Sequence, residues 1–146
     1  MYHLATLFVT LFTLVSGLRV LAQTETTLSY DTTYDNASLS LNDVACSDGS
    51  NGLESKNYTT LGSLPKFPNV GGVYTVTGWN SPSCGACYAV TYAGTTVNIL
   101  AVDVSKTGFT VSEAAMNTLT GNQAVALGRV NVTFVPTSGS ACGLPN

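Results

Sequence analysis

Four cysteines are the residues of this chain best suited to special chemistry. Cys84 and Cys87 stand three residues apart, whereas Cys46 and Cys142 lie far from them in the sequence. A Cys-x-x-Cys pair can be a redox centre, half of a zinc site, or two halves of different disulfides. A redox centre needs a helix directly after the second cysteine to lower the thiol pKa. Here the sequence after Cys87 alternates like a strand, so the redox interpretation is not favoured.

Structural disulfides are the interpretation that we prefer. A zinc site would need two further Cys or His ligands at short spacing, but the only histidine is His3, close to the start of the chain. Four cysteines allow three pairings. We favour Cys46–Cys84 with Cys87–Cys142, which ties both ends of the domain to its middle, over Cys84–Cys87 with Cys46–Cys142. Each favoured bridge would stabilise the fold by about 4 kcal/mol through loop entropy.

The remaining side chains exclude several kinds of enzyme. Once a predicted leader that contains His3 is removed, the chain has no histidine, which excludes Ser-His-Asp and Cys-His catalysis and histidine-ligated metals. Paired cysteines leave no thiolate nucleophile, and no glycine motif with its lysine is present to bind a phosphate. We therefore expect no cofactor. Carboxylate chemistry remains, as in glycosidases, which need two carboxylates flanking one bond.

One carboxylate stands out by its setting. Residues 98–104 predict a buried strand in which Asp103 is the only acidic residue. Aspartate is disfavoured in strands and is costly in apolar surroundings unless it is hydrogen-bonded. Asp103 therefore either caps a neighbouring backbone loop or lines a groove, and the first alternative is common for buried carboxylates.

Two short sequences have the composition of a sugar-binding site, in which an aromatic ring stacks on the sugar and polar side chains bind its hydroxyl groups. Trp79 and Asn80 in the central loop provide one such pair, and Tyr34 and Asp35 near the N-terminus provide another. Trp79 is the only tryptophan. The alternative is that it fills the core beside the disulfides, because tryptophan is buried on average.

The chain of 146 residues is predicted to consist of a signal peptide, residues 1–22, and a single domain, residues 23–146. Residues 4–15 form an apolar run that is too short to span a membrane, and residues 20–22 offer small side chains to a signal peptidase. Secretion agrees with the predicted disulfides, which persist in oxidising compartments. We expect an extracellular or cell-wall location.

The composition argues against several partners and favours a β domain. The formal net charge is −3, and it moves to about −4 when Arg19 leaves with the leader. No basic run is present, so neither nucleic acid nor an anionic membrane is an expected partner. Only 9% of the residues are charged, and glycine and small polar residues abound. Such a composition is typical of an extracellular β domain rather than a helical bundle.

Alternating apolar residues predict several strands. The strand-like runs cover residues 28–34, 73–77, 88–92, 95–104 and 130–134. Ala93-Gly94 is expected to join two of these runs as a hairpin. Residues 64–72 resemble a loop inside the domain, because they contain prolines and adjacent glycines.

Helix signals are few. Ser112 is a predicted N-cap, and Ala115, Met116 and Leu119 form an apolar stripe before Gly121. A second short helix is expected within residues 122–127.

Three Asn-x-Ser/Thr triplets, at Asn36, Asn57 and Asn131, are weak signals of glycosylation and better signals of exposure.

Several motifs together resemble those of the cerato-platanin family. They are Ser29-Tyr30-Asp31, Tyr34-Asp35-Asn36, Ala45-Cys46-Ser47-Asp48-Gly49, Gly78-Trp79-Asn80, Cys84-Gly85-Ala86-Cys87, Leu100-Ala101-Val102-Asp103, Gly121-Asn122-Gln123-Ala124 and Cys142-Gly143-Leu144. The match extends over residues 28–144. One position differs, because the family often has Trp where this chain has Tyr88, and tyrosine can still stack on a sugar.

The resemblance implies a mainly β fold: a six-stranded double-psi β-barrel with two short helices and two disulfides, paired as favoured above. It implies a secreted fungal protein that binds chitin, N-acetylglucosamine oligomers and cellulose and loosens cell walls as expansins do. It also implies that the protein elicits plant defence through a plant surface receptor and that it can self-assemble. The family's groove aspartate corresponds to Asp103. Around it we expect Trp79, Asn80, Tyr34 and Asp31 or Asp35 to bind carbohydrate.

The sequence therefore supports three hypotheses about the function of the protein. The first is a carbohydrate-binding protein without catalytic activity. The second is a weak endoglucanase-like hydrolase that uses Asp103 with a second carboxylate about 5–10 Å away, for which Asp48 and Asp35 are the candidates. The third is a surface-assembling protein with a role like that of a hydrophobin, which low charge and a 45% apolar composition permit.

Overall fold

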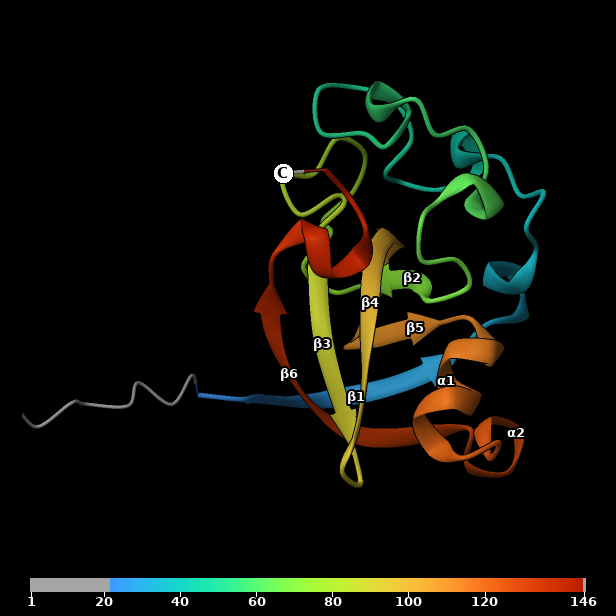
Figure 1. The fold of residues 1–146 in the computed structure, drawn as a ribbon, viewed down its shortest axis with the longest axis vertical. Helices are drawn as coiled ribbons and strands as arrows, with labels where there is room; N and C mark the ends of the chain where they lie inside the picture. Colours follow the sequence, from blue (N-terminus) through green and yellow to red (C-terminus); the bar gives the residue numbers. More distant parts are fainter. Residues whose placement is uncertain (1–21, 146) are drawn as a thin grey trace, which may run out of the picture.

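Six strands form a closed barrel. The computed structural model describes residues 22–145, and the predicted leader lies outside these residues except for Ala22. The strands are β1 (Thr24–Tyr30), β2 (Val70–Val73), β3 (Cys87–Tyr92), β4 (Thr95–Val104), β5 (Phe109–Val111) and β6 (Arg129–Thr137). They follow one another around the barrel in the order β1-β5-β2-β4-β3-β6 (Figure 1).

The barrel mixes parallel and antiparallel neighbours. β1 pairs with β5 in parallel and β2 pairs with β4 in parallel. The other four pairs around the barrel are antiparallel. Closure leaves no strand edge exposed along the ring, which removes the usual site of edge-to-edge aggregation. The expected six-stranded double-psi barrel is confirmed.

Three aromatic rings fill the inside of the barrel. Tyr88, Phe109 and Phe134 come from three different strands, and each pair of rings meets edge to face with centroids 5.1–5.7 Å apart. Edge-to-face pairs add roughly 0.5–1.5 kcal/mol beyond the burial of area. The alternation predicted for residues 130–134 is confirmed, because Val130, Val132 and Phe134 are buried.

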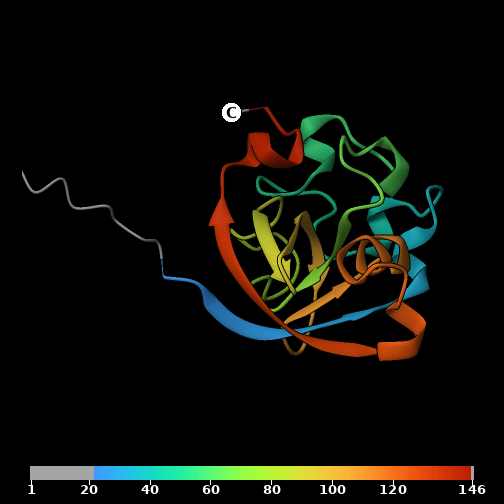
Figure 2. The same ribbon diagram turned by 60° about the horizontal axis from the view of Figure 1, so that its bottom comes forward.

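The hairpin and both helices lie where the sequence predicts them. β3 and β4 pair in register across the turn at Ala93-Gly94, where both residues have positive φ. α1 (Glu113–Thr120) begins at its N-cap Ser112 and ends at Gly121, and α2 (Ala124–Leu127) follows it. α1 packs its buried face against the barrel at β4 and β1, and Figure 2 shows it from a second side.

Two predicted strands have other bounds. The strand expected over residues 28–34 ends at Tyr30, because the Asp31 side chain accepts a hydrogen bond from the Thr33 amide and starts the 3-10 helix η1 (Thr32–Asp35). The strand expected over residues 73–77 instead ends at Val73 and begins at Val70, inside the predicted loop.

Close packing explains why glycines stand in β2. A Cβ atom on Gly71 would lie 2.3 Å from the Thr110 carbonyl oxygen, and one on Gly72 would lie 2.6 Å from that of Val104. Only glycine allows the strands on both sides to approach this closely. The pair therefore marks a central strand.

A long irregular segment, residues 31–69, connects β1 to β2 across one end of the barrel (Figure 1). Its backbone turns through short 3-10 helices, and its leucines provide the apolar anchors. Leu41, Leu53, Leu61 and Leu64 are all buried. The segment therefore packs as part of the domain although it contributes no barrel strand.

Two disulfides fasten this end of the molecule. Cys46 bonds to Cys84 and Cys87 bonds to Cys142, with Cα–Cα distances of 5.2 and 5.8 Å. The pairing favoured from the sequence is confirmed. The first bridge joins the 31–69 segment to the loop before β3, and the second joins β3 to the end of the chain.

No helix within residues 22–145 has the length and apolar character needed to cross a membrane.

The carboxylate of Asp35 stabilises α1. It accepts hydrogen bonds from the amides of Glu113 and Ala114 at 2.7 and 3.0 Å, while the Ser112 hydroxyl accepts one from the amide of Ala115. These three amides have no partner inside the helix, and a carboxylate at this end also faces the positive pole of the helix dipole. Asp35 therefore links the 31–69 segment to α1.

We predict that Asp35→Ala lowers the free energy of unfolding by about 1–3 kcal/mol, because it leaves two amides without their acceptor. Denaturant unfolding followed by circular dichroism measures this change. Asp43→Ala is the matched control, because Asp43 is an exposed acid of the same segment and its loss should change stability by less than about 0.5 kcal/mol. Equal stability of the two variants would contradict the assignment.

Candidate functional site

Asp103 lies near the end of β4 and binds the 31–69 segment. Its Oδ1 accepts hydrogen bonds from the amides of Ala45 and Val104 at 3.0 and 2.8 Å, and its Oδ2 accepts one from the Tyr34 hydroxyl at 3.0 Å. Asp103 thus caps a neighbouring backbone loop, the first of the two expected roles. A carboxylate offers about four lone-pair positions, so Oδ2 keeps one for a further donor.

Tyr34 orients Asp103 and does not offer a stacking face. Its ring is buried, with only 8% of the residue exposed. Burial raises the pKa of Tyr34 far above its ordinary value, and the nearby carboxylates of Asp103 and Asp31 raise it further. The exposed Asp31 caps η1, and its carboxylate is close enough to Tyr34 to raise the pKa of the phenol.

Trp79 is an exposed platform and not a core residue. It is 64% exposed, and its indole Nε1 donates a hydrogen bond to Oδ1 of Asp48. An exposed tryptophan has many rotamers available, and this hydrogen bond selects among them. The alternative in which Trp79 fills the core is therefore wrong.

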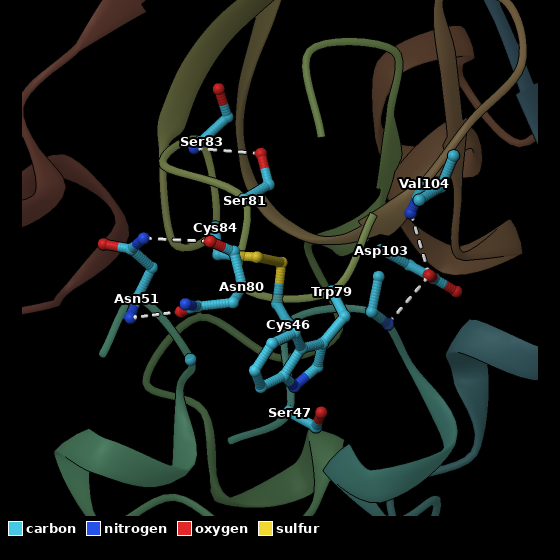
Figure 3. The surroundings of a disulfide bond; sticks show 12 residues. Cys46, Ser47, Asn51, Trp79, Asn80, Ser81, Ser83, Cys84, Asp103 and Val104 are labelled. Atoms are coloured by element: carbon cyan, nitrogen blue, oxygen red, sulfur yellow. Dashed lines mark hydrogen bonds between the residues drawn. A yellow bond between two sulfur atoms is a disulfide. The ribbon is translucent and has the colours of Figure 1, made fainter. Parts of the chain in front are cut away.

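Asn80 fixes the backbone next to Trp79. Its Oδ1 accepts a hydrogen bond from the Asn51 amide at 2.8 Å, and its carbonyl oxygen accepts one from Nδ2 of Asn51 at 2.9 Å. Gly49 leaves room for this contact, because a Cβ atom there would lie 2.7 Å from Oδ1 of Asn80. The two loops therefore meet through a matched pair of asparagines beside the Cys46–Cys84 bridge (Figure 3).

Residues 45–48 connect Asp103 with Trp79. Asp103 accepts a hydrogen bond from the amide of Ala45, and Asp48 accepts one from the indole of Trp79. Cys46, which lies between Ala45 and Asp48 in the sequence, forms a disulfide with Cys84. Three residues of extended chain span at most roughly 11 Å, so the two contacts are close neighbours. Figure 3 draws Trp79, the bridge and Asp103 in one view. We call Asp31, Tyr34, residues 45–48, Trp79, Asn80 and Asp103 the Trp79 surface.

Asp35 does not share this surface chemistry, because both of its oxygens bind the amides of α1. The three glycosylation triplets have the exposure predicted for them: Asn36, Asn57 and Asn131 are all exposed.

Sequence reasoning missed the positions of Asp48 and Asn51 next to Trp79. From the sequence, Asp48 is expected only as a possible second carboxylate, and Asn51 has no predicted role. The signal that could have found them is the Cys46–Cys84 pairing, which brings the turn after Cys46 beside the loop before Cys84. Because the disulfide fixes Cys46, the short polar turn that follows it must lie close to the loop before Cys84.

The hollows of the molecule lie elsewhere. One of about 510 Å³ lies between β1, β6 and the β3–β4 turn, and one of about 210 Å³ lies beside Lys66 and Asn69. Neither is lined by a residue of the Trp79 surface. Across residues 22–145, no three His, Cys, Asp or Glu side chains cluster as metal ligands would.

We predict that the contribution of Tyr34 to stability is present below about pH 10 and is lost above it. In the unfolded chain the phenol ionises near its ordinary pKa of 10.0, whereas in the folded state the raised pKa keeps it protonated. The unfolded state then binds fewer protons, so stability falls as the pH rises. Denaturant unfolding from about pH 8 to pH 11 measures this fall.

Tyr34→Phe should show a shallower alkaline fall than the parent protein, and a loss of about 1.5–3 kcal/mol at neutral pH from the bond to Asp103. Tyr58→Phe, at a half-buried tyrosine of the same segment, is the control. A fall of the same steepness in Tyr34→Phe and in the control would show that Tyr34 is not the group responsible.

Comparison with known proteins places the chain in one family. The family model described as Cerato-platanin matches residues 26–144. The heat-stable 19 kDa antigen of Coccidioides immitis is 50% identical over 119 residues, which cover 82% of this chain and 82% of that protein. The cerato-platanin of Ceratocystis fimbriata f. sp. platani is 45% identical over 117 residues, covering 79% of this chain and 84% of that one.

Solved structures agree with the sequence comparisons. The crystal structure of cerato-platanin 3 from M. perniciosa is 50% identical, with a TM-score of 0.80 over 83% of this chain and 100% of that one. The solution structure of the fungal elicitor cerato-platanin is 46% identical, with a TM-score of 0.72 over 80% of this chain and 95% of that one. With its barrel, its two disulfides and these similarities together, the chain belongs to the cerato-platanin family.

Proposed function

We propose that this chain is a secreted carbohydrate-binding protein that uses the Trp79 surface to bind chitin, N-acetylglucosamine oligomers or cellulose without cleaving them. The observation that carries the proposal is an exposed tryptophan whose indole is fixed by a carboxylate. Two disulfides and membership in a secreted family support the extracellular location.

The fixed indole is suited to a pyranose ring. Sugars present apolar C–H faces and polar edges, so a rigid aromatic face next to hydrogen-bonding groups can bind both parts. Because Asp48 already holds Trp79, little rotamer entropy is lost when a ligand is bound. The open lone pair of Asp103 Oδ2 and the exposed carboxylate of Asp31 are the acceptors that we assign to sugar hydroxyls.

The exposure of Trp79 favours a long polymer over a small free sugar. Small-molecule sites are concave and enclose most of the ligand, whereas Trp79 is 64% exposed. An exposed indole can stack on one sugar of a polysaccharide chain that is itself part of a wall. We propose that wall loosening follows when these groups compete for the hydrogen bonds between neighbouring polysaccharide chains.

The hydrolase alternative is less well supported by the geometry. Glycosidases need an acid and a second carboxylate on the two sides of one glycosidic bond. Of the two partners considered for Asp103, Asp35 binds the amides of α1 and Asp48 binds the indole of Trp79. We therefore propose binding without catalysis.

Family membership supports a fungal elicitor-type protein, since one of the similar structures is that of a fungal elicitor. We propose that plants perceive this chain in the same way, through a receptor at the cell surface. The proposal for carbohydrate and the proposal for perception are separate, because perception of the fold needs no sugar.

We predict that Trp79→Ala weakens the binding of chitotetraose by at least about tenfold, which corresponds to about 1.4 kcal/mol. Asp48→Ala should weaken it less, because the indole remains but is no longer fixed. Isothermal titration calorimetry on the mature protein measures the dissociation constants. Val125→Ala is the control, because Val125 is an apolar residue of similar exposure, 69%, on α2.

Equal affinity of Trp79→Ala and Val125→Ala would remove Trp79 from the binding surface. An activity assay on the mature protein distinguishes the binding hypothesis from the hydrolase hypothesis. Release of reducing sugar from swollen cellulose that disappears in Asp103→Asn would support the hydrolase and contradict the proposal. The Asn variant is suitable because its amide oxygen can still accept the Ala45 amide hydrogen bond.

A further inference from the structure

The hollow of about 510 Å³ lies on the outer face of the barrel, where β1, β6 and the β3–β4 turn meet. Figures 1 and 2 show β1 and β6 side by side in this region, with the hairpin tip next to them. It is far from the Trp79 surface, because β4 runs from Thr95 at the hairpin tip to Asp103, a length of about 26 Å at 3.3 Å per residue.

Strand register gathers polar side chains around this hollow. On β6, Asn131 and Thr133 alternate with buried residues and so face outward. Asn131 is opposite Thr27 of β1, and Thr133 is opposite Glu25 of β1 on one side and Thr91 of β3 on the other. All five side chains line the hollow, which therefore has hydroxyl, carboxylate and amide groups along its walls.

One of these residues, Asn131, can carry a covalently attached glycan. Asn131-Val132-Thr133 is an N-glycosylation triplet, and Asn131 is exposed. A glycan attached to Nδ2 of Asn131 would begin at the wall of the hollow. The other two triplets, at Asn36 and Asn57, lie in the 31–69 segment, and neither asparagine lines this hollow.

The size and lining of the hollow suit the first sugars of such a glycan. Its volume lies within the range of about 300–1,000 Å³ that is typical of small-molecule sites. Thr91 of β3 has the same outward orientation as Thr133, its partner on β6. The Thr91 and Thr96 hydroxyls are bonded to each other at 2.7 Å, and Arg129 Nη1 donates to the Thr27 hydroxyl at 2.9 Å, so two of the polar groups are held in place.

We propose that Asn131 is N-glycosylated and that the first two N-acetylglucosamine residues of its glycan lie in this hollow, within reach of Glu25, Thr91 and Thr133. In the modification, Nδ2 of Asn131 forms a bond to the anomeric carbon of a lipid-pyrophosphate-linked oligosaccharide. The anomeric C–O bond to the pyrophosphate breaks, the lipid pyrophosphate leaves, and the amide loses one proton. The proposal rests on secretion and is independent of carbohydrate binding at the Trp79 surface.

The test uses the full chain with its own leader, secreted from a eukaryotic host. Glycopeptide mass spectrometry shows which asparagines are occupied. An endoglycosidase that cuts between the two core sugars then reports their accessibility in native and in denatured protein. We expect Asn131 to be occupied and its glycan to be cut at least about tenfold more slowly in the native protein, because a core that is bound about nine-tenths of the time exposes only the remaining fraction.

Glycans at Asn36 or Asn57, wherever they are present, are internal controls and should be cut at similar rates in both states. Glu25→Ala should reduce the protection at Asn131, because Glu25 is an exposed residue that lines the hollow. Thr24→Ala is the control on the same strand. An unoccupied Asn131, equal cleavage in the two states, or protection that is unchanged in Glu25→Ala would each overturn the proposal.

Discussion

The hydrogen bond between the Asp103 carboxylate and the Ala45 amide joins the barrel to the irregular segment that crosses its end. An aspartate in a strand is unfavourable unless its oxygens are bonded, and here three donors bind them. One residue further, the Cys46–Cys84 bridge fastens the same segment to the loop before β3. Asp48 therefore has a fixed position, and it can in turn fix Trp79. Each of these contacts positions the next group, so the barrel determines where the indole of Trp79 lies.

The strands of the barrel form the scaffold, and the connections between them carry the exposed functional groups. The strands close into a ring around Tyr88, Phe109 and Phe134, which leaves the connections free to carry polar and aromatic groups. This arrangement is common, because rigid scaffolds position functional residues on loops. One end has the Trp79 surface, where a single fixed indole is exposed to solvent. The hollow beside Asn131 lies near the other end of the β3–β4 hairpin, and its distance from Asp103 allows the two regions to act independently.

Much of this fold could be predicted from local sequence. The hairpin at Ala93-Gly94 follows from turn chemistry, and α1 follows from Ser112 and Gly121. The disulfide pairing is one of several possible from the residues, and the family resemblance implies it. Other features depend on contacts between distant residues, which local patterns do not contain. Gly71 and Gly72 indicate a loop until the strands packed against them are known. Asp35 resembled a sugar-binding residue because nothing in the sequence places it at the start of α1, and the partnership of Asp48 with Trp79 depends on which cysteines pair.

The central claim is that the segment held by Asp103 and the Cys46–Cys84 bridge presents Trp79 to polysaccharide. It is tested most directly by following the amide and indole signals of the mature protein by NMR during titration with chitotetraose. We predict that the largest shifts belong to residues 45–48, 79, 80 and 103, with the Trp79 indole signal among them, while residues 124–127 of α2 remain unchanged. Shifts confined to the hairpin, or saturating shifts that leave the Trp79 indole unmoved, would contradict it.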